Sequence, residues 1–130
     1  MLGGATVVAT LDLTHKALAV SERGGAVLAH QRSASYIVGL AAISLAWAGA
    51  IALVRSVSVA LPGGLVLGGA VGNLASFALW PSLPGVPDPL VAGEFAFNLA
   101  DVSAVLGLAL LLPAILFFAA RNRERLFEPV

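Results

Sequence analysis

The sequence predicts an all-α membrane protein: a four-transmembrane-helix bundle with both termini cytoplasmic and short extracytoplasmic loops. Three observations predict it. The chain of 130 residues is 59% hydrophobic and 11% charged, whereas soluble domains are about 45–50% apolar and about 25% charged. Its mean hydropathy is +0.98. Its apolar segments also approach the length of about 20 residues that a helix needs to cross the hydrocarbon core. We expect residues 1–130 to form a single membrane domain.

The first two predicted spans cover residues 2–20 and 34–54. The first is short, and its apolar stretch carries charged residues. It lacks the basic start of a cleaved signal peptide, so we interpret it as a retained helix. The polar stretch "SERGGAVLAHQRS" separates it from the second span, which stops at Arg55.

The last two predicted spans cover residues 61–80 and 95–120. Pro62 suits the first turn of the third helix, where its missing N–H costs nothing. Between these spans the stretch "PSLPGVPDPLVAGE" contains four of the seven prolines. Because prolines interrupt regular helices, we predict a loop there.

Basic residues predict the orientation. If the chain crosses the membrane four times, its arginines fall into two groups on opposite sides. The group with more arginines marks the cytoplasmic side. Both termini are then cytoplasmic, and Trp80 is an interfacial anchor at the outer end of the third span. The cytoplasmic group is Arg55, Arg121, Arg123 and Arg125, and the outer group is Arg23 and Arg32.

Charge and cysteine content exclude several function classes. Seven acidic and seven basic residues give no net charge, so nothing suggests a nucleic-acid partner. The absence of cysteine rules out disulfides, thiolate metal sites and a cysteine nucleophile. His15 has too few potential ligands near it in sequence for a metal site. We therefore expect no metal and no cofactor, and we expect membrane lipids as neighbours.

Small residues recur at every fourth position of the third span, at Gly64, Gly68, Gly72 and Ser76. In lipid, helices associate through close backbone approach over small residues. The stripe therefore predicts a packing face, and Asn73 beside it is expected to point into the bundle.

Two polar groups lie within the first and last spans. Asp12 and Lys16 are four residues apart with the acid first, the favourable order for an ion pair. A charge at mid-bilayer costs about 2.5–3.5 kcal/mol on insertion scales, so we expect this pair to face the bundle. Asn98 and Asp101 are three residues apart on one face of the fourth helix, near its outer end.

Asn73 and Ser76, also three residues apart, lie on the antiparallel third helix at a depth similar to that of Asn98 and Asp101. Two polar pairs at one depth predict a site just below the outer surface. The alternative is that these groups only form interhelical hydrogen bonds, worth about 0.6 kcal/mol each. Spacing alone does not decide between the two.

The stretches "GGAVGNLAS" and "FAFNLAD", followed by Gly107, resemble the signature region of the signal peptidase II family. That family consists of four-helix membrane aspartic proteases of bacteria, which remove signal peptides from lipid-modified prolipoproteins. Its pattern has Gly-Asn followed three residues later by a catalytic Asp, and then Phe-Asn-x-Ala-Asp, which ends in the second. The resemblance implies a multi-pass protein of the bacterial cytoplasmic (inner) membrane.

Three weaker matches follow in the family's order. "DLTHK" resembles Asp-Gln-x-Thr-Lys, with matches at Asp12 and Lys16. "ERGGAV" resembles Asn-x-Gly-x-Ala-Phe, with matches at Gly24 and Ala26. "GVPD", which ends in Asp88, resembles a short Val and Asp motif between the last two helices. The resemblance implies that Asn73, Asn98, Asp12, Lys16 and Gly24 contribute to substrate binding.

The chain departs from the family at the catalytic dyad. The second aspartate corresponds to Asp101, but the first corresponds to Ser76, and Phe77 replaces the basic residue that usually follows. An aspartic protease needs two carboxylates, one acting as base and the other as acid. A serine hydroxyl does not titrate near neutral pH, and no base lies beside Ser76 in sequence.

Three interpretations follow. In one, the protein is an aspartic endopeptidase whose dyad is completed by another carboxylate, with Asp88 the first candidate and Asp12 and Glu94 the next. In the second, it is a non-catalytic membrane protein of the same fold, a pseudoenzyme that binds prolipoprotein signal peptides or another membrane protein. A structural membrane protein without a site is the third option.

Overall fold

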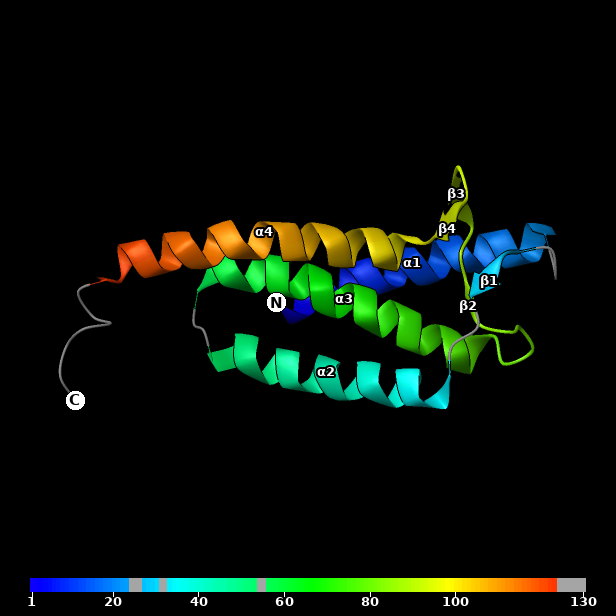
Figure 1. The fold of residues 1–130 in the computed structure, drawn as a ribbon, viewed down its shortest axis with the longest axis horizontal. Helices are drawn as coiled ribbons and strands as arrows, with labels where there is room; N and C mark the ends of the chain where they lie inside the picture. The colour runs from blue at the N-terminus through cyan, green and yellow to red at the C-terminus, as the bar shows by residue number, and fades with distance from the viewer. Residues whose placement is uncertain (24–26, 31–32, 54–55, 124–130) are drawn as a thin grey trace.

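The computed structural model describes residues 1–23, 27–30, 33–53 and 56–123 and contains four long helices. Figure 1 shows them as an antiparallel bundle in which each helix runs opposite to the one before it. The helices are α1 (Leu2–Arg23), α2 (Ala34–Leu53), α3 (Val57–Leu79) and α4 (Leu99–Arg121).

Three of these helices, α2, α3 and α4, are long and apolar enough to cross a membrane. The protein is therefore a multi-pass membrane protein. α1 has 22 residues, but polar and charged residues interrupt its apolar stretch. That α1 also crosses the bilayer, and that both termini are cytoplasmic, stay predictions.

α3 begins earlier than the sequence predicts. Its first residue is Val57, so Pro62 lies inside the helix and not in its first turn. The helix starts where the Ala60 N–H donates to the Ser56 carbonyl oxygen at 2.8 Å. A proline inside a membrane helix is tolerated because neighbouring groups satisfy the carbonyl that it leaves without a donor.

The predicted span 95–120 begins too early. Residues 95–97 form a strand, and α4 starts only at Leu99. The reason is Asn98, whose extended backbone (φ −133°, ψ 175°) and side chain cap the helix. A capping box, in which the side chains of Asn98 and Asp101 each accept the other's backbone N–H, fixes this start.

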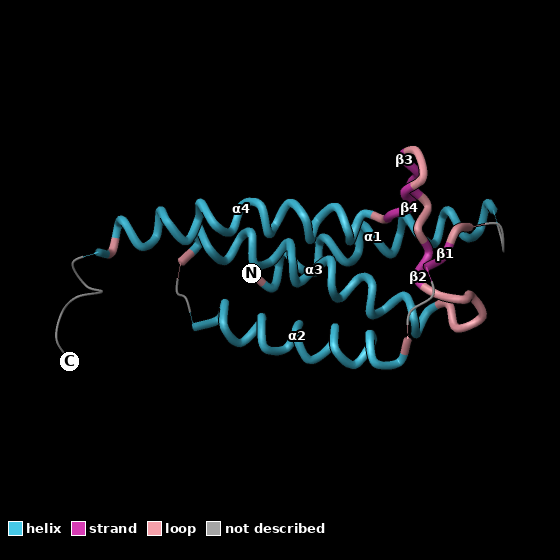
Figure 2. The backbone as a smooth tube through the Cα atoms, viewed as in Figure 1, coloured by secondary structure: helices cyan, strands magenta, loops and turns pink. Residues whose placement is uncertain are grey.

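Residues 81–94, predicted as a loop, contain short strands (Figure 2). Four closely spaced prolines disfavour a regular helix here, but extended backbone is compatible with them. The hairpin of β3 and β4 turns at Gly93, whose φ of +61° favours glycine. The antiparallel pairs are β1 (Ala29–His30) with β2 (Val86–Pro87) and β3 (Leu90–Ala92) with β4 (Phe95–Phe97).

α3 lies at the centre and contacts all three other helices. Its small-residue stripe packs against α1: a Cβ on Gly68 would lie 2.7 Å from the Ala5 carbonyl oxygen, and one on Gly72 2.7 Å from Asp12 Oδ2. Gly69, one residue round the helix, packs against the Ala100 carbonyl of α4. Small residues therefore set both interfaces, as packing in lipid requires.

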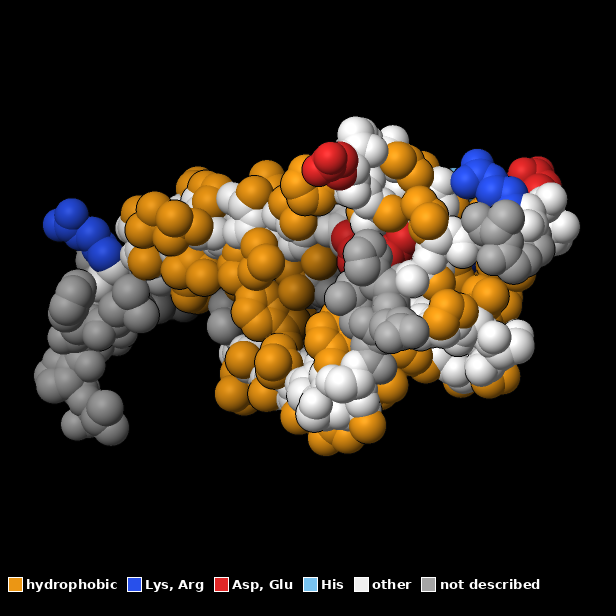
Figure 3. All heavy atoms as spheres, turned by 45° about the vertical axis from the view of Figure 1, so that its right-hand side comes forward, with side chains coloured by type: hydrophobic (Ala, Val, Ile, Leu, Met, Phe, Trp, Pro, Cys, Tyr) orange, Lys and Arg blue, Asp and Glu red, His pale blue; other side chains and the backbone are white. Residues whose placement is uncertain are grey.

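The outside of the bundle is apolar. In Figure 3 hydrophobic side chains cover much of the visible helical surface, and the visible Lys and Arg side chains lie at its two ends. Leu45, Leu53 and Val57 are 76%, 84% and 86% exposed. In water such a surface would be unfavourable, and a lipid environment accounts for it.

Candidate functional site

Polar side chains gather where α1, α3 and α4 meet the strands. Most of them are buried, although the surrounding helices are apolar. Buried polar groups need partners. Ser44 of α2 donates to the Leu40 carbonyl oxygen of its own helix, and the contacts of the other residues, together with those of the half-buried Asp101, form two connected clusters. The buried polar residues are Asp12, Lys16, Ser44, Asn73, Ser76, Asp88 and Asn98.

The first cluster centres on Lys16 of α1. Its Nζ lies 2.6 Å from Asp12 Oδ2, 2.8 Å from Asn73 Oδ1 and 3.1 Å from Ser76 Oγ, and it donates to all three. These three contacts use all three N–H donors of the ammonium group. Both members of the ion pair are fully buried. The i, i+4 pairing predicted from the sequence is present.

Asp12 also connects α1 to α4. Its Oδ1 accepts a hydrogen bond of 2.9 Å from the backbone N–H of Ala100, in the first turn of α4. A carboxylate at a helix N-terminus interacts favourably with the free N–H groups and the helix dipole. Gly72 makes room for this carboxylate, because a Cβ there would meet Asp12 Oδ2. Asp12 is therefore engaged on both oxygens.

Ser76 belongs to the Lys16 cluster. Its hydroxyl donates to the Gly72 carbonyl oxygen at 2.8 Å and accepts from Lys16. The side chain is fully buried, with 0% exposure. The sequence placed no base beside Ser76, and the fold does place an amine there. That amine is ion-paired with Asp12 and donates to Ser76, whereas the Ser76 hydroxyl donates to Gly72. A general base would instead accept the hydrogen bond of a nucleophilic serine.

The second cluster contains Asp101, whose two carboxylate oxygens have different partners. Oδ1 accepts from Asn73 Nδ2 at 2.9 Å, and Oδ2 accepts from the backbone N–H of Asn98 at 3.2 Å. In return Asn98 Oδ1 accepts from the Asp101 N–H at 3.0 Å. Asn73 is therefore the link between the clusters, since its oxygen binds Lys16 and its nitrogen binds Asp101.

Asp88 joins the same cluster through Asn98. Asn98 Nδ2 donates to Asp88 Oδ1 at 2.5 Å, and the Asp88 backbone N–H donates to the Leu28 carbonyl at 2.8 Å. The side chain is 1% exposed. Pairing of β1 with β2 carries Asp88 into this position. One asparagine thus contacts both Asp88 and Asp101.

An apolar groove between α2, α3 and α4 leads to Asp101. Its cavity volume is about 320 Å³. Asp101 and Asn73 are polar groups in a lining otherwise dominated by aliphatic and aromatic side chains. Concave apolar sites with a few convergent polar groups are typical ligand sites. The lining includes Tyr36, Leu40, Ile43 and Trp47 of α2, Leu67 and Ala70 of α3, and Ala104 and Leu108 of α4.

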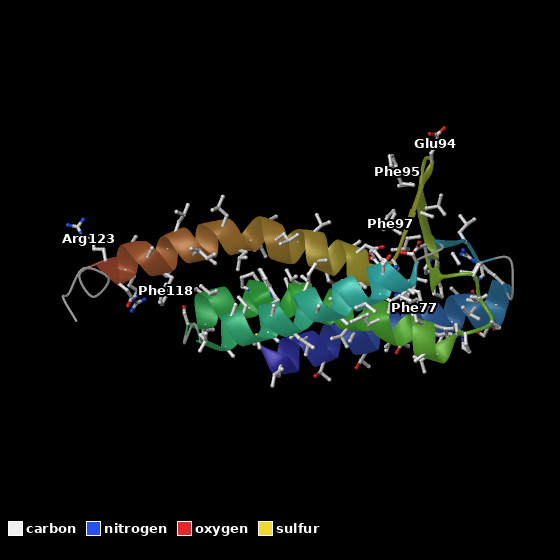
Figure 4. All side chains as sticks on the ribbon, turned by 60° about the horizontal axis from the view of Figure 1, so that its bottom comes forward. Phe77, Glu94, Phe95, Phe97, Phe118 and Arg123 are labelled. Carbon is white, nitrogen blue, oxygen red and sulfur yellow. The ribbon has the colours of Figure 1, made fainter. Side chains whose placement is uncertain are left out.

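The remaining candidates divide as follows. Gly24 lies outside the described residues. Glu94 is exposed, and in Figure 4 it is at the tip of the hairpin, away from the cluster. Motif analysis missed Tyr36 and Trp47, because nothing in the spacing of α2 shows which of its faces borders the groove. Their aromatic character within an apolar helix was the only available signal.

Comparison with known proteins identifies a family for most of the chain. Residues 15–117 match the family model described as signal peptidase (SPase) II. The matched segment contains Lys16, Asn73, Ser76, Asp88 and Asp101. No curated protein and no solved structure matches the chain.

Proposed function

We propose that this chain, which belongs to the signal peptidase II family, binds prolipoprotein signal peptides in the groove. In this proposal Asp101 and residue 76 do not form a catalytic dyad, so these two residues do not cleave the bound peptide. The signal segment would lie between α2, α3 and α4. The observation that carries the proposal is the position of Ser76, whose oxygen faces Lys16 and Gly72 while Asp101 lines the groove.

The groove supports binding of an apolar peptide. It is bordered by aliphatic and aromatic side chains, so burial of a signal segment there would require no desolvation of charge except at Asp101. Its polar end offers a carboxylate and the Asn73 amide, which are groups able to contact a peptide backbone. Apolar walls with few oriented polar groups suit such a ligand.

The chemistry of the dyad argues against cleavage by Asp101 with Ser76. One carboxylate must activate water while the other protonates the carbonyl oxygen. The Ser76 hydroxyl hydrogen goes to the Gly72 carbonyl, and its lone pairs face Lys16. It supplies neither an acid nor a base of suitable pKa near neutral pH.

A second candidate function is proteolysis with Asp88 as the substitute acid. It is favoured by Asn98, which contacts Asp88 Oδ1 through its amide and Asp101 Oδ2 through its backbone N–H. Asp12 is a weaker candidate because Lys16 and Ala100 occupy its two oxygens. Glu94 at the hairpin tip is weaker still.

Binding and cleavage of a diacylglyceryl-modified precursor, measured with the purified protein, test both candidate functions. We expect binding but no cleavage by the natural chain, and cleavage by Ser76→Asp, which places a second carboxylate in the family's position. Ser76→Asn is the matched control, because the asparagine side chain has the size of aspartate but no carboxyl group. Cleavage by Ser76→Asp should disappear when Asp101→Asn is added.

Two results would contradict the proposal. If the natural chain cleaves the precursor and Asp88→Asn abolishes this cleavage, Asp88 is the second acid and the protein is a protease. Absence of both cleavage and signal-peptide binding in the natural chain contradicts the binding function as well.

A further inference from the structure

Two cavities lie toward the end of the bundle where α2 ends, α3 begins and α4 ends (Figure 1). Phe118 borders both of them. It follows Asp101 by 17 residues, which is about 26 Å along α4 at 1.5 Å per residue. Asp101 itself borders the groove and a smaller apolar cavity beside Phe97. The cavities at Phe118 are therefore distant from Asp101.

The first of them, here called the apolar chamber, extends from Trp47 to Phe118 and has a volume of about 360 Å³. The polar group of its lining side chains, the Trp47 indole N–H, already donates to the Gly63 carbonyl oxygen at 3.2 Å. A hydrocarbon chain can enter this chamber without desolvating a polar group, whereas a peptide backbone would find no hydrogen-bond partner among these side chains. The lining includes Trp47, Ile51, Val59, Leu111, Ile115 and Phe118.

The second, here called the polar chamber, has a volume of about 340 Å³ and combines aromatic with polar side chains. Arg121 supplies a permanent positive charge there, and its exposed side chain is accessible to a ligand. The hydroxyl oxygens of Ser56 and Ser58 lie 2.7 Å apart. Their mutual hydrogen bond uses one of the two hydroxyl hydrogens, so the other can be donated to an acceptor in the chamber. The lining includes Ser56, Ser58, Phe117, Phe118, Arg121 and Asn122.

Charge at this end of the bundle favours an anion. Arg121 and Arg123 lie there, and the acidic residues that the structure describes lie either inside the bundle or toward its other end. Because α2, α3 and α4 are each long and apolar enough to cross a membrane, their ends lie at a bilayer surface, where lipid phosphates are found. The described acidic residues are Asp12, Glu22, Asp88, Glu94 and Asp101.

We propose that the two chambers together bind one anionic phospholipid of the bilayer, with an acyl chain in the apolar chamber and the phosphate in the polar chamber beside Arg121. Phe118 lies between them, at the position of the glycerol backbone. A basic pocket between membrane helices suits an anionic headgroup, and the adjoining apolar chamber suits its chain. This lipid is separate from the precursor, so the site does not depend on the proposed function. Its acyl chain ends at Trp47, which also borders the groove.

Trp47 is a natural reporter for this site. The chain has two tryptophans, and Trp80 lies at the opposite end of α3. In a Trp80→Phe background, Trp47 fluorescence is measured with the full chain in phosphatidylcholine nanodiscs. An increasing fraction of the lipid is replaced by phosphatidylglycerol or, in a matched series, by phosphatidylcholine, each brominated on its acyl chains. Bromine quenches tryptophan at short range, so the two series give the relative affinity of the two lipids for the apolar chamber.

We expect phosphatidylglycerol to be preferred about fivefold, the effect of one cation near a membrane surface. Arg121→Gln should abolish this preference, and Arg121→Lys should retain it. Arg123→Gln is the matched control, because Arg123 lies at the same end and lines neither chamber. In Figure 4 it projects away from Phe118. This control should change the preference by less than about twofold.

A second pair of variants tests the apolar chamber. Ala50→Phe obstructs it beside Trp47. Ala52→Phe is the matched control, because Ala52 is exposed on the same helix and lines neither chamber. We expect Ala50→Phe to abolish the preference for phosphatidylglycerol and Ala52→Phe to leave it unchanged.

Several results would overturn the phospholipid site. Equal quenching by the two lipids shows that the headgroup is not recognised, and a preference that persists in Arg121→Gln shows that Arg121 does not recognise it. Absence of quenching by either lipid shows that another molecule covers the apolar chamber. Loss of the preference when glycerol 3-phosphate is added to the medium shows a phosphate site that does not require a lipid. Failure of signal-peptide binding affects only the proposed function.

Discussion

The two positions that the sequence motifs predict to correspond to the family's aspartates lie in contrasting surroundings. Ser76 is fully buried in a cluster with Lys16 and Gly72, between α1 and α3. Asp101 is only partly buried, is held by Asn73 and Asn98, and lines two apolar cavities. One side of the site therefore serves packing, whereas the other remains open to a ligand.

This difference is compatible with the proposed absence of one carboxylate from a site whose frame is intact. Lys16, Asp12 and Asn73 satisfy one another around Ser76, so a neutral hydroxyl fits there without leaving a charge unpaired. Asp101 keeps partners that also fix the start of α4. Asp101 therefore has a structural role at the start of α4 beside any functional one.

The largest expected effect on stability comes from the cluster around Ser76 and Lys16. Lys16→Met leaves Asp12 charged and buried without its cation, so the free energy of unfolding should fall by about 3–5 kcal/mol. Unfolding in detergent, followed by circular dichroism, measures it.

The control is the double change Asp12→Leu with Lys16→Met. Replacement of a buried ion pair by apolar residues is often neutral, so the double variant should recover most of the loss. A single Lys16→Met variant as stable as the natural chain would show that the ion pair does not hold α1 to the bundle.

An intermediate effect on stability is expected at the α3–α4 interface. The position of Asp101 depends on the close packing of these two helices. A Cβ on Gly69 would clash with the Ala100 backbone carbonyl, which cannot move without shifting α4. Gly69→Ala should therefore cost about 1–3 kcal/mol of unfolding free energy.

Gly49→Ala in α2 is the matched control, because its Cβ would meet nothing within 4 Å. It should be neutral or stabilising by up to about 1 kcal/mol. Equal effects of the two substitutions in the same unfolding assay would contradict the packing argument.

The smallest effect separates the two positions directly. Ser76→Ala removes one contact with Lys16, whose other two partners remain. Interhelical hydrogen bonds in membranes average about 0.6 kcal/mol, so stability should fall by about that amount. Signal-peptide affinity should be unchanged. A marked loss of affinity would place Ser76 in the ligand site and remove the contrast between the two sides.

The sequence by itself determined the membrane class, the four helices, the Asp12–Lys16 pairing and the family. Each of these depends on local composition or on spacing along one helix. The apolar pattern predicts too early a start for α4, because the strand "FAF" precedes the cap and is as hydrophobic as the helix. The Asn98 and Asp101 spacing, which is typical of a capping box, indicates the observed start.

Only the tertiary structure decided which groups meet across helices. That Lys16 contacts Ser76, that Asn98 connects Asp88 with Asp101, and that Asp101 borders two cavities all depend on the rotation and depth of separate helices. Those are set by close contacts over Gly68, Gly69 and Gly72. Hydrophobicity determines that a helix lies in lipid. Within lipid it does not favour one apolar face of a helix over another as the contact with its neighbours. The packing of small residues therefore determines which face makes that contact.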